Sequence, residues 1–75
     1  MDVRALRQMT TEQLLNELED LKEAMFKQRL QMASAQLEDT NALRRTRRDI
    51  ARVKTVLRER QLAAQVAGEE SKKNG

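Results

Sequence analysis

Residues 10–25, with the sequence TTEQLLNELEDLKEAM, decide the fold because they carry both the start of a helix and its apolar face. Thr10 and Gln13 have the spacing of a capping box, in which each side chain accepts a hydrogen bond from the other residue's backbone N–H. Met9 and Leu14 stand where a hydrophobic staple would pack across that start. Apolar residues then recur at helical intervals, at Leu14, Leu18, Leu21 and Met25. This pattern predicts an amphipathic helix that begins near residue 10.

The apolar face of this helix continues to Met32, with Gln28 in the position between Met25 and Met32. We therefore predict one helix over about residues 10–34, and three further apolar residues widen its face on the flanks: Leu15, Phe26 and Leu30. Met25 and Met32 are interpreted as fillers of gaps in the core. Phe26 is the only aromatic residue, and the sequence is equally consistent with a core position and with an exposed contact.

A second helix is predicted over about residues 40–64, after a loop over about residues 35–39. Small and polar residues gather in that loop, and Asp39 and Thr40 are both favourable N-caps. The apolar seam of the second helix is spaced at 3, 4, 3 and 4 and includes one threonine: Leu43, Thr46, Ile50, Val53 and Leu57. Two such helices joined by a short loop predict an all-α fold, an antiparallel αα-hairpin of two long helices.

The two ends of the chain differ in their apolar content. Residues 2–8 are predicted to form a short extra helical turn, with Val3 and Leu6 packed back onto the hairpin. A single domain would then span residues 1–67. Residues 68–75, GEESKKNG, contain no apolar residue and are predicted to form a flexible, disordered tail.

The composition excludes most kinds of active site. The chain has 75 residues and lacks Cys and His, so it has neither thiolate nor imidazole, the usual metal ligands and general bases. Its two glycines, Gly68 and Gly75, cannot form a phosphate-binding loop. We therefore expect no enzyme, no catalytic residue, no metal, no cofactor and no small-molecule substrate. Apolar runs are too short for a membrane span or a secretory signal, so a cytoplasmic protein is expected.

Charge is divided unevenly between the two predicted helices. Residues 10–32 contain five acidic and three basic residues, a net charge of −2, whereas residues 44–60 contain eight basic and two acidic residues, a net charge of +6. At about 100° per residue, the basic residues of the second helix form two strips. One lies opposite the apolar face and comprises Arg44, Arg48 and Arg52, with Arg45 beside it. The other runs along one flank and comprises Arg47, Lys54 and Arg58.

These strips predict a polyanionic partner. Like charges four residues apart destabilise an isolated helix by about 0.2–0.5 kcal/mol per pair. Their presence is therefore better explained by binding to an external polyanion than by helix stability. Arginine outnumbers lysine seven to one in this segment, and its planar guanidinium suits phosphate. Because aromatic residues are almost absent, recognition is predicted to rest on phosphates and shape. The charge pattern alone does not distinguish RNA from DNA.

Two other functions stay open on this evidence. One is a homodimeric helical-bundle adaptor that binds an acidic partner. Two helices alone form a thin core, and a second copy of the chain would enlarge it. A DNA-binding regulator is less favoured, because the sequence has no recognition-helix module and no zipper beside its basic region.

The segment RRTRRDIARVKT, residues 44–55, resembles the characteristic segment of the ribosomal large-subunit protein twenty-nine family of bacterial type. The first helix is similar to that of the family at Leu6-Arg7, at three leucines and at FKQR, residues 26–29, so that the resemblance covers about residues 1–62. It implies a structural constituent of the large ribosomal subunit near the peptide exit tunnel. It also implies contacts with large-subunit ribosomal RNA, with neighbouring ribosomal protein twenty-three and with nascent-chain factors.

The resemblance further implies which residues contact ribosomal RNA. On the second helix these are Arg44, Arg47, Arg48, Arg52 and Thr55, and the flanking strip adds Lys54. On the first helix they are Lys27 and Arg29. A cytoplasmic, ribosome-associated protein without catalytic activity is the resulting expectation.

Overall fold

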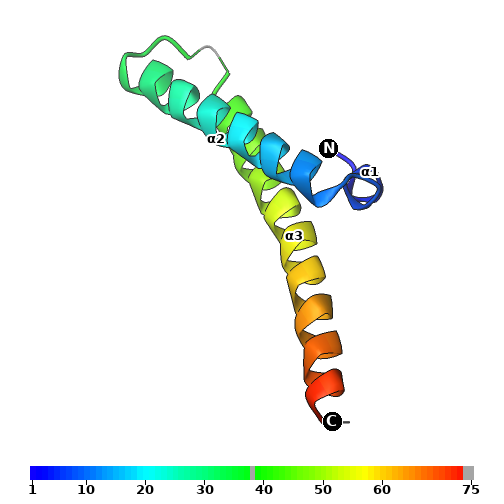
Figure 1. Cartoon of the computed structure of the whole chain (residues 1–75). Coiled ribbons are helices and arrows are strands. Elements are labelled where there is room, and N and C mark those ends of the chain that lie inside the picture. The colour runs from blue at the N-terminus through cyan, green and yellow to red at the C-terminus, as the bar shows by residue number, and fades with distance from the viewer. Residues whose placement is uncertain (38, 74–75) are drawn as a thin grey trace.

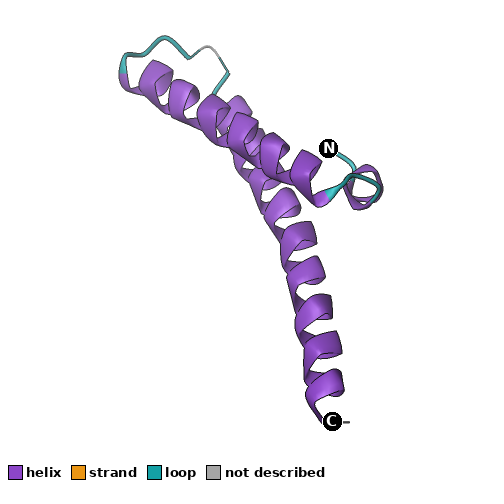
Figure 2. Cartoon of the chain, in the orientation of Figure 1, coloured by secondary structure: helices purple, strands orange, loops and turns teal. Residues whose placement is uncertain are grey.

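The computed structural model describes residues 1–37 and 39–73, and side chains as far as residue 66. Its helices are α1 (Val3–Arg7), α2 (Thr11–Ala33) and α3 (Asn41–Lys73), and the described residues contain no strand (Figure 2). α2 and α3 pack as an antiparallel pair, and α1 folds back against α3 (Figure 1). The predicted all-α hairpin with a short N-terminal helical turn is therefore confirmed. The molecule is 59 Å long and 21 Å across, because α3 projects well beyond the hairpin.

The start of α2 follows the predicted capping box. The Thr10 backbone N–H donates to Gln13 Oε1 at 2.9 Å, and the Gln13 N–H donates to Thr10 Oγ1 at 3.1 Å. Met9 is partly buried against the core that contains Leu14, as the hydrophobic staple requires. Local sequence alone therefore fixes where α2 begins.

The end of α2 depends on a residue with an unfavourable backbone conformation. Ser34 closes the helix, and its hydroxyl donates to the Leu30 carbonyl oxygen at 3.0 Å. The next residue, Ala35, has φ of 56°, in the left-handed region. The chain then turns so that the Gln36 N–H donates to the Gln31 carbonyl oxygen at 2.7 Å. Helices commonly end on such a left-handed residue, but it is usually glycine, because a Cβ atom crowds the backbone there.

Replacing Ala35 with glycine is therefore expected to stabilise the protein. Relief of the left-handed strain contributes about 1 kcal/mol, partly offset by the greater freedom of glycine in the unfolded chain. Thermal unfolding followed by circular dichroism should give a higher Tm for Ala35→Gly than for the parent chain. Ala33→Gly, within the last turn of α2, is the matched control and should lower the Tm. An equal or lower Tm for Ala35→Gly would contradict this explanation of the turn.

The core is small and comes from all three helices. Leu6 of α1, Leu14 of α2, and Val53 and Val56 of α3 are each at most 1% exposed. At about 1.5–3 kcal/mol for each fully buried aliphatic side chain, these four residues supply much of the driving force for folding. Val56 lies about 60° around α3 from Val53, outside the predicted seam. It is buried because α1 adds a third apolar surface, which also confirms the predicted packing of Val3 and Leu6.

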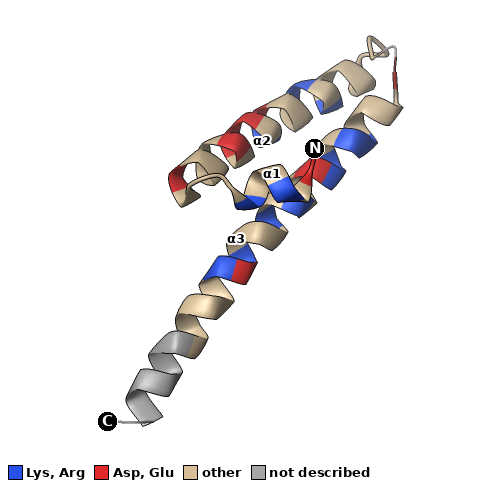
Figure 3. Cartoon of the chain, turned by 90° about the vertical axis from the view of Figure 1, so that its right-hand side faces the viewer, with Lys and Arg blue, Asp and Glu red and all other residues tan. Residues whose placement is uncertain are grey.

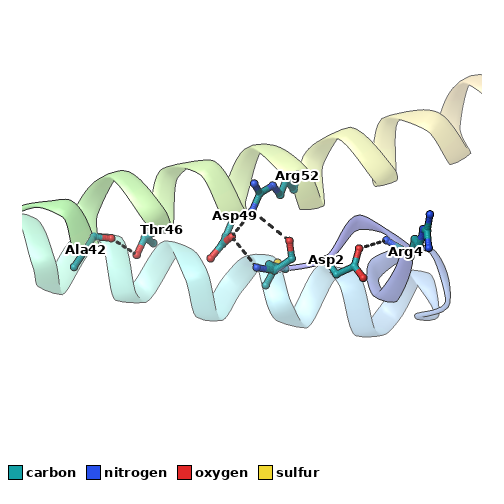
Figure 4. A network of polar contacts seen from close by, with 7 residues as sticks. Asp2, Arg4, Ala42, Thr46, Asp49 and Arg52 are labelled. Carbon is teal, nitrogen blue, oxygen red and sulfur yellow. Dashed lines mark hydrogen bonds and ion pairs between the residues drawn. The ribbon is translucent and has the colours of Figure 1, made fainter.

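Two polar residues occupy seam positions between α2 and α3. Thr46 is only 8% exposed, and its hydroxyl donates to the Ala42 carbonyl oxygen at 3.0 Å (Figure 4). Gln28 Oε1 is buried and has no hydrogen-bond partner among the described residues. The contact between the helices is therefore most apolar near α1 and becomes more polar toward the loop.

Several apolar residues of α2 do not join the core. Leu15, Phe26 and Leu30 are 49%, 63% and 56% exposed, so they do not widen the buried face. Met32, interpreted as a core filler, is 45% exposed. The physical reason is that α2 packs against only one long helix, so that a narrow stripe of its surface is covered. Phe26 is accordingly an exposed residue.

The second long helix ends later than predicted. α3 continues to Lys73 rather than ending near residue 64, so that residues 68–73 of the predicted tail are helical, whereas residues 74 and 75 lie outside the described residues. The predicted boundary rested on the loss of apolar residues, which ends tertiary packing but does not break a helical backbone. No proline follows residue 64, and one glycine costs a helix only about 1 kcal/mol.

Candidate nucleic-acid interface

The first half of α3 forms the basic part of the surface. In Figure 3, Lys and Arg run along α3 from its start to the region beside α1, whereas Asp and Glu gather in the N-terminal half of α2. The side chains of both predicted strips are exposed: Arg44, Arg45, Arg47, Arg48, Arg52, Lys54 and Arg58. Buried Thr46, Ile50 and Val53 face the hairpin instead. The angular prediction of an apolar inner face and basic outer strips is confirmed in its geometry.

Two of these arginines are held by neighbouring acceptors. Arg45 Nη2 lies 2.8 Å from Asp39 Oδ2. Arg52 Nη1 donates to Asp49 Oδ1 at 3.3 Å and to the Met1 carbonyl oxygen at 3.2 Å (Figure 4). Asp49 also lies 3.8 Å from the Met1 amino nitrogen, so that it joins α3 to the N-terminal segment. An external phosphate would have to compete with these acceptors for both arginines.

Three other arginines have no such internal acceptor. Within the part of the chain whose side chains are described, Arg44, Arg47 and Arg48 form no ion pair and no side-chain hydrogen bond. Lys54 and Arg58 share this property within the same part of the chain. Because no contact with another described side chain has to be broken, these side chains are the best placed to bind an external anion.

Two of the three remaining residues predicted to contact RNA already form contacts within the protein. The Thr55 hydroxyl donates to the Ala51 carbonyl oxygen at 2.7 Å, so its proton is already used within α3. Lys27 Nζ lies 3.3 Å from Glu23 Oε1 on the same face of α2. Arg29 is exposed. Lys27 and Arg29 belong to the C-terminal half of α2. Because α2 and α3 are antiparallel, this half of α2 lies beside the first half of α3 (Figure 1).

Arg60 has a structural role that the sequence analysis did not identify. Its guanidinium donates to the carbonyl oxygens of Met9 at 2.6 Å and Arg7 at 3.2 Å, and to Thr11 Oγ1 at 3.0 Å. These acceptors lie where α1 ends and α2 begins, so the hydrogen bonds of Arg60 link both helices to α3. Helix ends leave carbonyl oxygens that need donors, but no local pattern indicates which distant arginine will supply them.

Asp39 fixes the start of α3 through its carboxylate. Asp39 Oδ1 accepts the Asn41 N–H at 2.9 Å. The hydrogen bond from Arg45, followed by that from the Asn41 backbone, lowers the pKa of the Asp39 carboxyl below its ordinary value of 3.8. Because the folded pKa lies below the unfolded one, the stabilisation is complete above about pH 3.8 and is lost as the pH falls through the lowered pKa.

We expect an NMR pH titration of the Asp39 carboxyl carbon to show this lowered pKa directly. Arg45→Gln should raise the pKa toward its ordinary value, because the largest cause of the shift is removed. Lys22→Gln, an exposed charge loss on α2, is the matched control and should leave the titration of Asp39 unchanged. The same pKa in the parent chain and in Arg45→Gln would contradict the assigned role of Arg45.

Other kinds of site find no support in the described part of the chain. No group of three or more metal-ligating side chains occurs there. No helix within it is long and apolar enough to cross a membrane.

The sequence of the chain matches a family of known proteins. The pattern of the family described as Ribosomal L29 protein matches residues 4–60. The chain belongs to this family. The matched region contains nearly all of α1, the whole of α2, and α3 as far as Arg60. Both basic strips and the contacts of Arg60 therefore lie inside the part that defines the family.

Individual relatives agree with this assignment. The chain is 45% identical over 64 residues to the large ribosomal subunit protein uL29 of Geobacillus stearothermophilus, an alignment that covers 85% of this chain and 97% of that protein. It is 53% identical over 60 residues to the uL29 protein of Limosilactobacillus fermentum, covering 80% of this chain and 88% of the relative. It is 47% identical over 62 residues to the uL29 protein of Clostridioides difficile, an alignment that covers 83% of this chain and 92% of that protein. The resemblance of residues 44–55 to this family is thus confirmed.

Proposed function

We propose that the protein is a non-enzymatic structural constituent of the large ribosomal subunit that binds large-subunit ribosomal RNA through the outer surface of α3. One observation carries the RNA-binding part of this proposal. Arg44, Arg47 and Arg48 stand exposed on the first two turns of α3 without an internal acceptor among the described side chains. Family membership supports RNA of the large subunit, rather than DNA, as the polyanion.

The chemistry of these side chains suits a folded RNA. Each guanidinium presents several N–H donors in one plane and can bind two phosphate oxygens at once. Paired RNA offers side chains mainly its backbone and shape, because its major groove is deep and narrow. A helix that is capped at Asp39 and held by Arg60 presents the arginines from a fixed backbone. Binding is therefore expected to position the protein on RNA shape more than to read a sequence.

The same family membership supports a more specific location on the ribosome. We propose that the protein lies near the peptide exit tunnel, beside ribosomal protein twenty-three and within reach of nascent-chain factors. The exposed apolar residues of α2, Phe26 and Leu30, are compatible with protein neighbours on the side away from α3. The protein would accordingly be found associated with ribosomes.

Ribosome fractionation through a salt series tests this proposal. The endogenous protein should sediment with the large subunit at low salt and leave it at high salt. If about six phosphate contacts are made, affinity should fall by about a thousandfold between 50 and 200 mM salt. Recovery of the protein only in the ribosome-free supernatant at low salt would contradict the proposal. A tight dimer of the purified chain that is indifferent to RNA would instead favour a helical-bundle adaptor.

A further inference from the structure

A hollow of about 290 Å³ lies at the loop end of the hairpin, between the last turn of α2 and the first turns of α3. Its walls combine apolar and basic side chains: Met32, Thr40, Asn41, Leu43, Arg44 and Arg47. The hollow lies on the loop side of Thr46, the first buried residue of α3, and Met32 in its wall is 45% exposed. We propose that this hollow holds the base of a single unpaired nucleotide, an inference that rests on the proposed RNA-binding function.

The apolar wall suits the face of a nucleobase. Met32 is 45% exposed although it occupies a seam position, and Leu43 opposite it is only half-buried. A thioether packs favourably against aromatic rings, and every nucleobase has an aromatic face. The described side chains contain one aromatic ring, on Phe26, and it does not line the hollow. Met32 and Leu43 therefore supply the surface on which a base can stack.

The basic wall suits the phosphates on either side of that nucleotide. Arg44 and Arg47 both line the hollow, and neither has an internal acceptor among the described side chains. The first N–H groups of α3 are not the source of attraction, because Asp39 already accepts the Asn41 N–H and places a negative charge there. The two guanidinium groups are thus the anion-binding groups, and the Asn41 side chain can contact the edge of the base.

The combination of an apolar wall and two arginines favours an unpaired nucleotide over a regular duplex. In paired RNA the base faces are stacked and inaccessible, so only the arginines could be used. A bulged or looped nucleotide offers a free base and two flanking phosphates together. The basic strips alone would bind an RNA helix at any position along its length. The hollow would fix the protein at the position of the unpaired nucleotide.

The test compares two short RNA hairpins that are identical except for one unpaired 2-aminopurine, a fluorescent analogue of adenine. The parent chain should bind the bulged hairpin up to about tenfold more tightly, which is the upper end of what one thioether–ring contact contributes. The fluorescence of the unpaired base should change on binding. Met32→Ser should remove most of this preference and the fluorescence change. Its affinity for the paired hairpin and its salt dependence should match those of the parent chain.

Leu30→Ser is the matched control, because Leu30 is also exposed on α2 but does not line the hollow. Circular dichroism should show the same helix content for both variants and the parent. Equal binding of both hairpins by the parent chain, with a normal salt dependence, would overturn the nucleotide site and leave the RNA-binding proposal standing. An equal loss of the preference for the bulged hairpin in Met32→Ser and Leu30→Ser would also overturn the nucleotide site. No salt-dependent binding to either hairpin would overturn both proposals.

Discussion

Loss of the Arg60 side chain is expected to destabilise the protein more than any other single charge removal on α3. Arg60→Ala deletes three hydrogen bonds from a charged donor, which join α3 to the end of α1 and the start of α2. At about 1.5–3 kcal/mol for a hydrogen bond to a charged group, discounted because these acceptors are mostly solvent-accessible, the expected loss is about 2 kcal/mol. At about 0.05–0.15 kcal/mol per residue, the total stability of a 75-residue chain is only about 4–11 kcal/mol, so this loss is a large fraction of it.

Thermal unfolding of Arg60→Ala should therefore show a Tm lower by about 8–16 °C. Arg58→Ala is the matched control, because Arg58 is exposed on the same helix and should change stability by no more than about 0.5 kcal/mol. Arg60→Lys should be intermediate, because one ammonium group cannot reach all three acceptors with the geometry of a guanidinium. Equal Tm values for Arg60→Ala and Arg58→Ala would show that these contacts do not hold the helices together.

The largest effect on RNA binding is expected from the three arginines that have no internal acceptor among the described side chains. A triple variant, Arg44→Gln, Arg47→Gln and Arg48→Gln, should lose about three phosphate contacts. Its affinity for large-subunit ribosomal RNA should fall on the order of a hundredfold or more at about 0.1 M salt. The slope of log affinity against log salt should become shallower by about 2–3. Fluorescence anisotropy over a salt series measures both quantities.

The matched control removes the same number of positive charges elsewhere, at Arg4, Arg7 and Lys22. All three are exposed, and Arg7 forms only a solvent-exposed ion pair with Glu59 at 3.3 Å. Its loss should matter little for stability. If binding depended only on net charge, the two triple variants would lose affinity equally. That outcome would refute a specific role for the outer surface of α3.

The sequence predicts the structure best where neighbours along the chain set it. The start of α2 follows from Thr10 and Gln13, which are three residues apart and satisfy each other. The outer strips of α3 follow from helical angles alone. The burial of Val56 and the contacts of Arg60 did not follow, because both depend on where α1 lies. The end of α3 was misplaced because apolar spacing reports packing rather than the length of the backbone helix.

For the candidate interface, sequence located the surface but not its available side chains. Angles place Arg48 and Arg52 on one strip, yet Asp49 and the Met1 carbonyl oxygen hold Arg52 while Arg48 has no described acceptor. Arg45 is likewise held by Asp39, six residues away across the start of the helix. Such pairings depend on rotamers and loop geometry, which a helical wheel does not contain. The hollow beside Met32 also required the structure, because spacing alone predicts that Met32 is covered.

The small core places a constraint on the order in which the protein can acquire its structure during synthesis. Leu6 and Leu14 are made early, but their buried partners Val53 and Val56 follow about 40–50 residues later. A growing chain that ends before residue 53 contains α1 and α2 but lacks the valines that cover these leucines. Most helical stability in proteins comes from packing of the apolar face rather than from helix propensity. Closing so long a loop also carries an entropy cost that local helix formation does not recover. The hairpin is therefore expected to form late and in one step, when Val53, Val56 and Arg60 leave the ribosome that makes them.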